Sequence, residues 1–355
     1  MPTIRTTRRR ALGSATGAAA AAFAAPLILR AGRADAQEIA KKFGFGQPGG
    51  ASTEATTEIF FKPFTQRTGI EVVLDVPSSF GKLRAMVQSG NVTASLWDLG
   101  SQQIEQAKAL DMIEPIDWDQ VQPGPMYPEM KNEYGFGQTY FSTVMAWRSN
   151  VKAPQNWRDF WNVKDFPGKR SLSNFPAYTI PAALVADGVT PDKLYPIDLD
   201  RAFKSLDKIK KDVSVWWTTG AQPAQLLIDN EVQYVNAWNG RVGPLEEQGI
   251  RHTFNEGFLD IAFYVSPKGS PRAEKRAAML FLRDWTDPVK QAEYAKRVYY
   301  TGSSPNLAPL LPQDKLHLFP TTPENKAKQS LPNGKWWFDN AALVEKRWQE
   351  WKLSG

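Results

Sequence analysis

The chain has 355 residues and a formal net charge of +6, but six of its 43 basic residues and only one of its 37 acidic residues lie within residues 1–36. The rest of the chain therefore carries a net charge of +1, which argues against the clustered basic surface that nucleic-acid binding requires. The sequence contains no cysteine, so it excludes a disulfide framework, a thiolate metal site and a cysteine nucleophile.

The first 36 residues have the pattern of an export signal. Arg8 and Arg9 form a twin-arginine region, residues 15–29 are apolar and rich in alanine, and small residues end at Ala36. The apolar run is shorter than the roughly 20 residues that a membrane-spanning helix needs. We therefore expect cleavage near Gln37 and a periplasmic protein that is soluble, because no cysteine follows to take a lipid anchor.

After the signal, strand and helix patterns alternate. A first structured stretch is expected at 39–45, strands at 70–76, 96–99 and 113–116, and helices at 53–68, 79–90 and 101–110. Such alternation indicates βαβ units and a largely parallel sheet.

A second α/β region follows residues 136–147, which read as a long strand or a crossing segment. It runs from 157 to about 256, with a helix at 200–211 and a strand at 232–237. A further strand is expected at 259–266, helices at 273–285 and 287–298, and a proline-rich tail that becomes helical at 340–351. The length and the two α/β regions favour two domains.

Six segments in this order resemble the periplasmic spermidine/putrescine-type solute-binding proteins of ABC importers. The segments are FKPFTQRTGIEV (61–72), FGKLRAMVQSG (80–90), LYPIDLDRAF (194–203), VWWTTGAQPAQLL (215–227), EVQYVNAWNGR (231–241) and VSPKG (265–269).

The resemblance implies a type II periplasmic-binding-protein fold of the α/β class, with two lobes that close on a ligand. Lobe 1 would comprise residues 37–143 with 262–300, and lobe 2 residues 144–261 with 301–355. Such a protein is a monomer without a cofactor or a bound nucleic acid. It hands a small solute to an inner-membrane ABC permease that works with a cytoplasmic ATPase.

Aromatic residues at two strand ends are candidates for the ligand surface. Trp216 and Trp217 precede a helix whose free N–H groups are expected near Gly220 and favour an anionic or polar ligand. Trp238 ends the strand at 232–237, and in spermidine-binding relatives a tryptophan at this position lies against the polyamine. The alternative for the first pair is an ordinary capped helix with two packed tryptophans.

The charged residues near this edge favour a carboxylate. Arg241 suits a carboxylate ligand, although a structural ion pair with Glu246 or Glu247 is an alternative. The resemblance places Ala262 where polyamine-binding relatives carry an ammonium-pairing aspartate. Asp260, two residues earlier, falls on the same strand face as Ala262.

We therefore expect a small carboxylate-bearing solute, aromatic or with one amine near Asp260. Polyamine binding, ferric-ion binding at Tyr299 and Tyr300, and an unrecognised periplasmic enzyme are the alternatives. The sequence shows no nucleophile–base pair or metal-ligand spacing, so no catalytic or metal residue is expected. The predicted ligand residues are Ser78, Ser79, Phe80, Tyr178, Trp216, Trp217, Gly220, Ala221, Gln222, Trp238, Arg241, Asp260 and Ala262.

Overall fold

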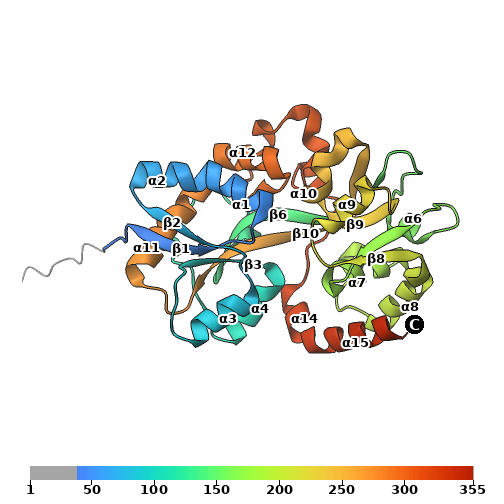
Figure 1. The fold of residues 1–355 in the computed structure, drawn as a ribbon, viewed down its shortest axis with the longest axis horizontal. Helices are drawn as coiled ribbons and strands as arrows, with labels where there is room; N and C mark the ends of the chain where they lie inside the picture. Colours follow the sequence, from blue (N-terminus) through green and yellow to red (C-terminus); the bar gives the residue numbers. More distant parts are fainter. Residues whose placement is uncertain (1–37, 355) are drawn as a thin grey trace, which may run out of the picture. The chain divides into compact units, whose positions relative to one another are not determined.

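The computed structural model describes residues 38–354, and the predicted export signal lies outside them. The elements form two α/β groups, and the later helix Arg272–Trp285 returns to the group that the chain forms first (Figure 1). The strands are β1 (Lys42–Gly46), β2 (Glu71–Asp75), β3 (Leu96–Gly100), β4 (Ile113–Glu114), β5 (Lys131–Asn132), β6 (Gly135–Arg148), β7 (Arg170–Ser173), β8 (Val213–Trp217), β9 (Tyr234–Trp238), β10 (Ile250–Pro267) and β11 (Thr301–Gly302).

Helices cover the strands, and within residues 38–354 none is long and apolar enough to cross a membrane. A π-helical turn joins the first two. The helices are α1 (Gly50–Thr56), α2 (Lys62–Thr68), α3 (Phe80–Gln88), α4 (Ser101–Ala109), α5 (Trp118–Val121), α6 (Trp157–Trp161), α7 (Pro176–Ala186), α8 (Leu199–Ile209), α9 (Gln222–Ile228), α10 (Asn239–Val242), α11 (Arg272–Trp285), α12 (Pro288–Val298), α13 (Pro323–Lys326), α14 (Gly334–Asp339) and α15 (Ala341–Leu353).

The strands form one mixed sheet in the order β2-β1-β3-β10-β6-β9-β7-β8. β1 pairs in parallel with β2 and β3, and β7 pairs in parallel with β8 and β9. The long strands β6 and β10 lie between these two groups and pair with each other in antiparallel fashion (Figure 1). The sheet is therefore less parallel than the sequence predicted, because both long strands run against their neighbours β3 and β9.

Each strand group has its own hydrophobic cores. On the β1 side, Phe45 packs at right angles against Phe281 of α11, with ring centroids 5.6 Å apart. On the β7 side, Leu206 of α8 and Trp348 of α15 share another core. Phe258 of β10 belongs to this second core, and no described core spans the two groups. The lobe boundaries given above stay a prediction.

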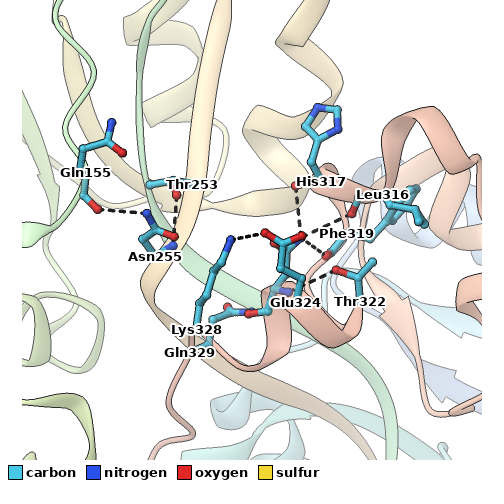
Figure 2. Close-up of polar contacts among 11 residues, drawn as sticks. Gln155, Thr253, Asn255, Leu316, His317, Phe319, Thr322, Glu324, Lys328 and Gln329 are labelled. Carbon is cyan, nitrogen blue, oxygen red and sulfur yellow. Dashed lines mark hydrogen bonds and ion pairs between the residues drawn. The ribbon is translucent and has the colours of Figure 1, made fainter.

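The C-terminal segment returns to β10 beside an irregularity in that strand. Leu259 donates its N–H to the Ser330 carbonyl at 2.9 Å. Figure 2 shows the turn that precedes this contact, where Lys328 pairs with Glu324 at 2.7 Å. From there α14 packs against α4, so the tail touches both strand groups.

Candidate functional site

A pocket of about 350 Å³ opens where the first turns of α4 and α7 meet. Its walls follow the carboxyl ends of β3, β7 and β9, which is where ligands bind in open α/β sheets. The lining residues of this α4–α7 pocket are Gly100, Ser101, Gln102, Gln103, Phe175, Pro176, Ala177, Tyr178, Trp238 and Asp260.

Trp238 forms the centre of an aromatic wall. Its ring meets Tyr178 and Trp217 edge to face, with centroids 5.7 Å and 5.5 Å apart, and Phe141 at 6.1 Å. Within residues 38–354, no group accepts the Trp238 indole N–H. A side chain at Gly220 would clash with the Trp238 ring, so only glycine permits this close approach.

Asp260 is the acidic residue of the pocket. The residue is 5% exposed. Its carboxylate accepts the Ile261 N–H at 2.7 Å, and no cationic side chain pairs with it in the described part of the chain. Burial raises the pKa of Asp260 to about 6, and the nearby Ser101 hydroxyl and Ile261 N–H offset only part of that rise. Ala262 is half-buried and stands opposite Gly100 and Thr139. Regular alternation places it on the same strand face as Asp260.

Arg241 lies next to the Trp238 ring, since both side chains approach Gly220, but it does not line the α4–α7 pocket. Its guanidinium contacts Tyr300: burial raises the pKa of Tyr300, and Arg241 lowers it in part. The Arg241 Nε has no hydrogen-bond partner among the described residues. The ion pair with Glu246 or Glu247 is not formed, since Glu246 accepts from His317 at 2.8 Å and Glu247 from Lys315 at 3.4 Å.

The structure separates the two adjacent tryptophans of β8. Trp217 is fully buried behind the pocket wall and donates its indole N–H to the Asn236 carbonyl at 2.9 Å. Trp216 points to the opposite face and packs on Trp348 and Trp351 of α15 at 5.7 Å and 5.5 Å. Strand alternation requires this separation, so Trp216 does not reach the pocket.

The predicted ligand residues at the start of α9 make contacts within the protein and do not line the pocket. The Gln222 side-chain oxygen accepts the Thr218 N–H at 2.7 Å and so orders the turn before α9, whereas α9 itself has no side-chain cap. Ala221 is the N-cap residue and, like Gln222, does not line the pocket.

The predicted residues before α3 also lie away from the pocket lining. Ser79 caps α3 by accepting the Lys82 N–H at 3.1 Å, and Ser78 donates its N–H to the Gln47 carbonyl at 2.7 Å. Phe80 packs against the hydrophobic core beneath α3.

Sequence reasoning missed several pocket residues. Gly100 ends β3 and the residues from Ser101 to Gln103 follow it, so the strand-end argument that pointed to Trp238 applies to them equally. Tyr300 was considered only with Tyr299 as a metal pair. The two rings have different neighbours: Tyr299 stacks on Phe319 and Tyr300 faces Phe141. The described residues also hold no cluster of three His, Asp or Glu side chains suited to a metal ion.

A family model and a similar protein both indicate the same family of solute-binding proteins. Residues 60–321 match the family model described as bacterial extracellular solute-binding protein. A γ-aminobutyric acid-binding protein of Pseudomonas aeruginosa is 31% identical, over 85% of this chain and 88% of that protein.

Solved structures agree with this result. An ABC transporter substrate-binding protein from Bradyrhizobium japonicum USDA 110 is 35% identical with a TM-score of 0.82, covering 87% of this chain and 99% of that one. A GABA receptor is 33% identical with a TM-score of 0.81, covering 88% and 98%. These similarities confirm the α/β periplasmic-binding-protein fold.

The contact between Gly220 and Trp238 gives a first test. Gly220→Ala should displace the Trp238 ring and lower the free energy of unfolding by about 1–3 kcal/mol, measured by urea denaturation. Gly81→Ala is the matched control, because its new Cβ meets only Ser79 at 3.9 Å and should not destabilise the protein. Equal stability of both variants, with an unmoved Trp238 in a crystal structure, would contradict the packing described here.

Proposed function

The chain belongs to the bacterial extracellular solute-binding protein family, and we propose that it captures a small amino acid with separated amine and carboxylate groups for an ABC importer. Membership of this family makes the chain a binding protein and not an enzyme. One observation carries the proposal: Asp260 and Arg241, of opposite charge, lie near the Trp238 ring without an ionic partner in the described residues.

The acidic end of the site fits an amine. A buried carboxylate is costly unless a cation pairs with it, so an ammonium group entering beside Asp260 would supply the missing charge. Asp260 is the one charged residue in the lining of the α4–α7 pocket. The site therefore favours a ligand with a single amine at this end.

The other end of the site fits a carboxylate. The planar guanidinium of Arg241 can bind a carboxylate through two parallel hydrogen bonds. The Trp238 ring lines the pocket and lies next to Arg241 at Gly220, so it offers an apolar surface for a short methylene chain between the two charged groups. Two similar proteins are named for γ-aminobutyric acid, which has one amine and one carboxylate separated by methylene groups. This compound, 4-aminobutyrate, is therefore the first ligand to test.

Polyamine binding is the second candidate, and the charges of the site disfavour it. A polyamine buries at least two ammonium groups, whereas the pocket lining supplies only Asp260. Ala262 stands on the same strand face but carries no charge.

We further propose that the protein works in the periplasm. Residues 1–36 would direct export by the twin-arginine route, and the absence of cysteine leaves no site for a lipid anchor. The soluble monomer would then deliver its ligand to an inner-membrane ABC permease, after closure of the two predicted lobes.

The ligand proposal predicts large effects at both ends. Arg241→Ala should weaken 4-aminobutyrate binding by about 2–5 kcal/mol, because the carboxylate would lose its ion pair. Asp260→Asn should weaken binding comparably at neutral pH. Isothermal titration calorimetry measures both effects.

The same titrations predict a pH dependence with a definite sign. The amine stays protonated below pH 9, whereas the pKa of Asp260 is raised to about 6. The affinity should therefore be constant above about pH 7 and fall roughly tenfold per pH unit below 6, as protonation removes the Asp260 charge. Asp260→Asn should abolish this fall.

A third variant separates the two candidate ligands. Ala262→Asp should improve the binding of putrescine and weaken that of 4-aminobutyrate, because it adds a second carboxylate to the strand face. Tight putrescine binding by the unmutated protein, insensitive to Arg241→Ala, would refute the amino-acid proposal.

The export proposal has its own test. Replacing both Arg8 and Arg9 by lysine should leave the precursor in the cytoplasm, as seen by immunoblotting of periplasmic and cytoplasmic fractions. Replacing Arg30 and Arg33 by lysine is the matched control and should not prevent export. Normal periplasmic accumulation of the Arg8/Arg9 variant would rule out the twin-arginine route.

A further inference from the structure

A small cavity of about 20 Å³ lies next to the α4–α7 pocket. Gln102, Ala177, Tyr178 and Asp260 line both spaces. We call the smaller space the side cavity. Its volume suits one water molecule, which needs roughly 10–15 Å³ of such space and at least two polar partners.

Tyr195 lines the side cavity but not the α4–α7 pocket, and another side chain holds its hydroxyl. The indole N–H of Trp337 donates to the Tyr195 oxygen at 2.8 Å, so this oxygen is already an acceptor. The hydroxyl hydrogen is therefore free to be donated elsewhere. Asp260 is close enough to raise the pKa of Tyr195, in addition to the larger effect of burial.

We propose that the side cavity holds one ordered water molecule. This water accepts a hydrogen bond from the Tyr195 hydroxyl and donates one to the Asp260 carboxylate. Tyr195 is then a positioning residue: it acts on the amine-binding carboxylate through the water and does not touch the ligand. The role of Asp260 in ligand binding rests on the function proposed above, whereas the water-linked contact itself does not.

The surroundings of Asp260 leave few other groups that can perform this role. The titratable groups facing it are Tyr178 from α7 and Tyr195, and the Ser101 hydroxyl approaches from α4. Among the described residues that line the two spaces, Asp260 alone is charged. A hydrogen bond that Tyr195 donates through the water therefore stabilises the ionised form of Asp260 without a cation. The negative charge of Asp260 then stays available to a ligand amine.

The test needs no ligand. NMR of the ligand-free protein labelled with ¹³C-aspartate, with the Asp260 signal assigned by Asp260→Asn, measures the titration midpoint of this carboxyl. Tyr195→Phe should raise the midpoint by about one pH unit, because the ionised form loses a hydrogen bond. Trp337→Phe, which removes only the indole donor behind Tyr195, should raise it by less.

Tyr234→Phe is the matched control, since it removes a hydroxyl that donates to the Lys152 carbonyl at 3.0 Å far from Asp260. An unchanged midpoint in Tyr195→Phe, or an equal rise in Tyr234→Phe, would overturn the proposal. A high-resolution crystal structure should show the water within hydrogen-bond distance of both groups, and a dry cavity would overturn it. Failure of the protein to bind 4-aminobutyrate would refute the proposed function alone, because both readouts use ligand-free protein.

Discussion

The antiparallel pairing of β6 with β10 joins the two groups of parallel strands into one sheet. The pairing runs from Ile250 opposite Arg148 to Tyr264 opposite Phe136, and each end is flanked by a different group of parallel strands. Because the two groups have separate hydrophobic cores, these strands are the principal sheet connection between them. Asp260 lies within this shared region, so the carboxylate is held by the most extensively paired part of the sheet.

The two unpaired charges of the site lower the stability of the folded protein, and a binding function explains why they are present. A buried carboxylate without a cation, as at Asp260, and an arginine without a carboxylate, as at Arg241, both lower stability unless something else compensates. Local conflicts of this kind are expected where sequence serves function instead of folding. Here the two charges lie near one tryptophan ring, and a ligand that carries both opposite charges would neutralise them together.

The sequence was sufficient for many of the elements, but not for β7 and α7 and not for the direction of the long strands. The helix at α8 was predicted because its buried positions Phe203, Leu206 and Ile209 follow a helical period. Alternating patterns carry no sign of strand direction, so the antiparallel course of β6 and β10 could not be read from them. The length of β10 was also missed, since Glu256 adopts a left-handed conformation within it and the register shifts between Thr253 and Phe258.

The same limits apply to the site. Trp238 was predicted from its place at a strand end, Asp260 from its strand face and Tyr178 from the family resemblance, and all three line the same pocket. Trp216 and Trp217 could not be distinguished, because adjacent strand residues point to opposite faces and the sequence does not say which face is the pocket. Phe141 and Tyr195 reach the region from a crossing strand and a loop, so only tertiary contacts identify them.

The central claim is that one ligand satisfies both unpaired charges. The most direct measurement is a crystal structure of the protein with 4-aminobutyrate. We predict the ligand amine within hydrogen-bond distance of the Asp260 carboxylate, the ligand carboxylate on Arg241, and the methylene chain against the Trp238 ring. A ligand bound in the reverse orientation, or elsewhere with Asp260 and Arg241 still unpaired, would contradict it.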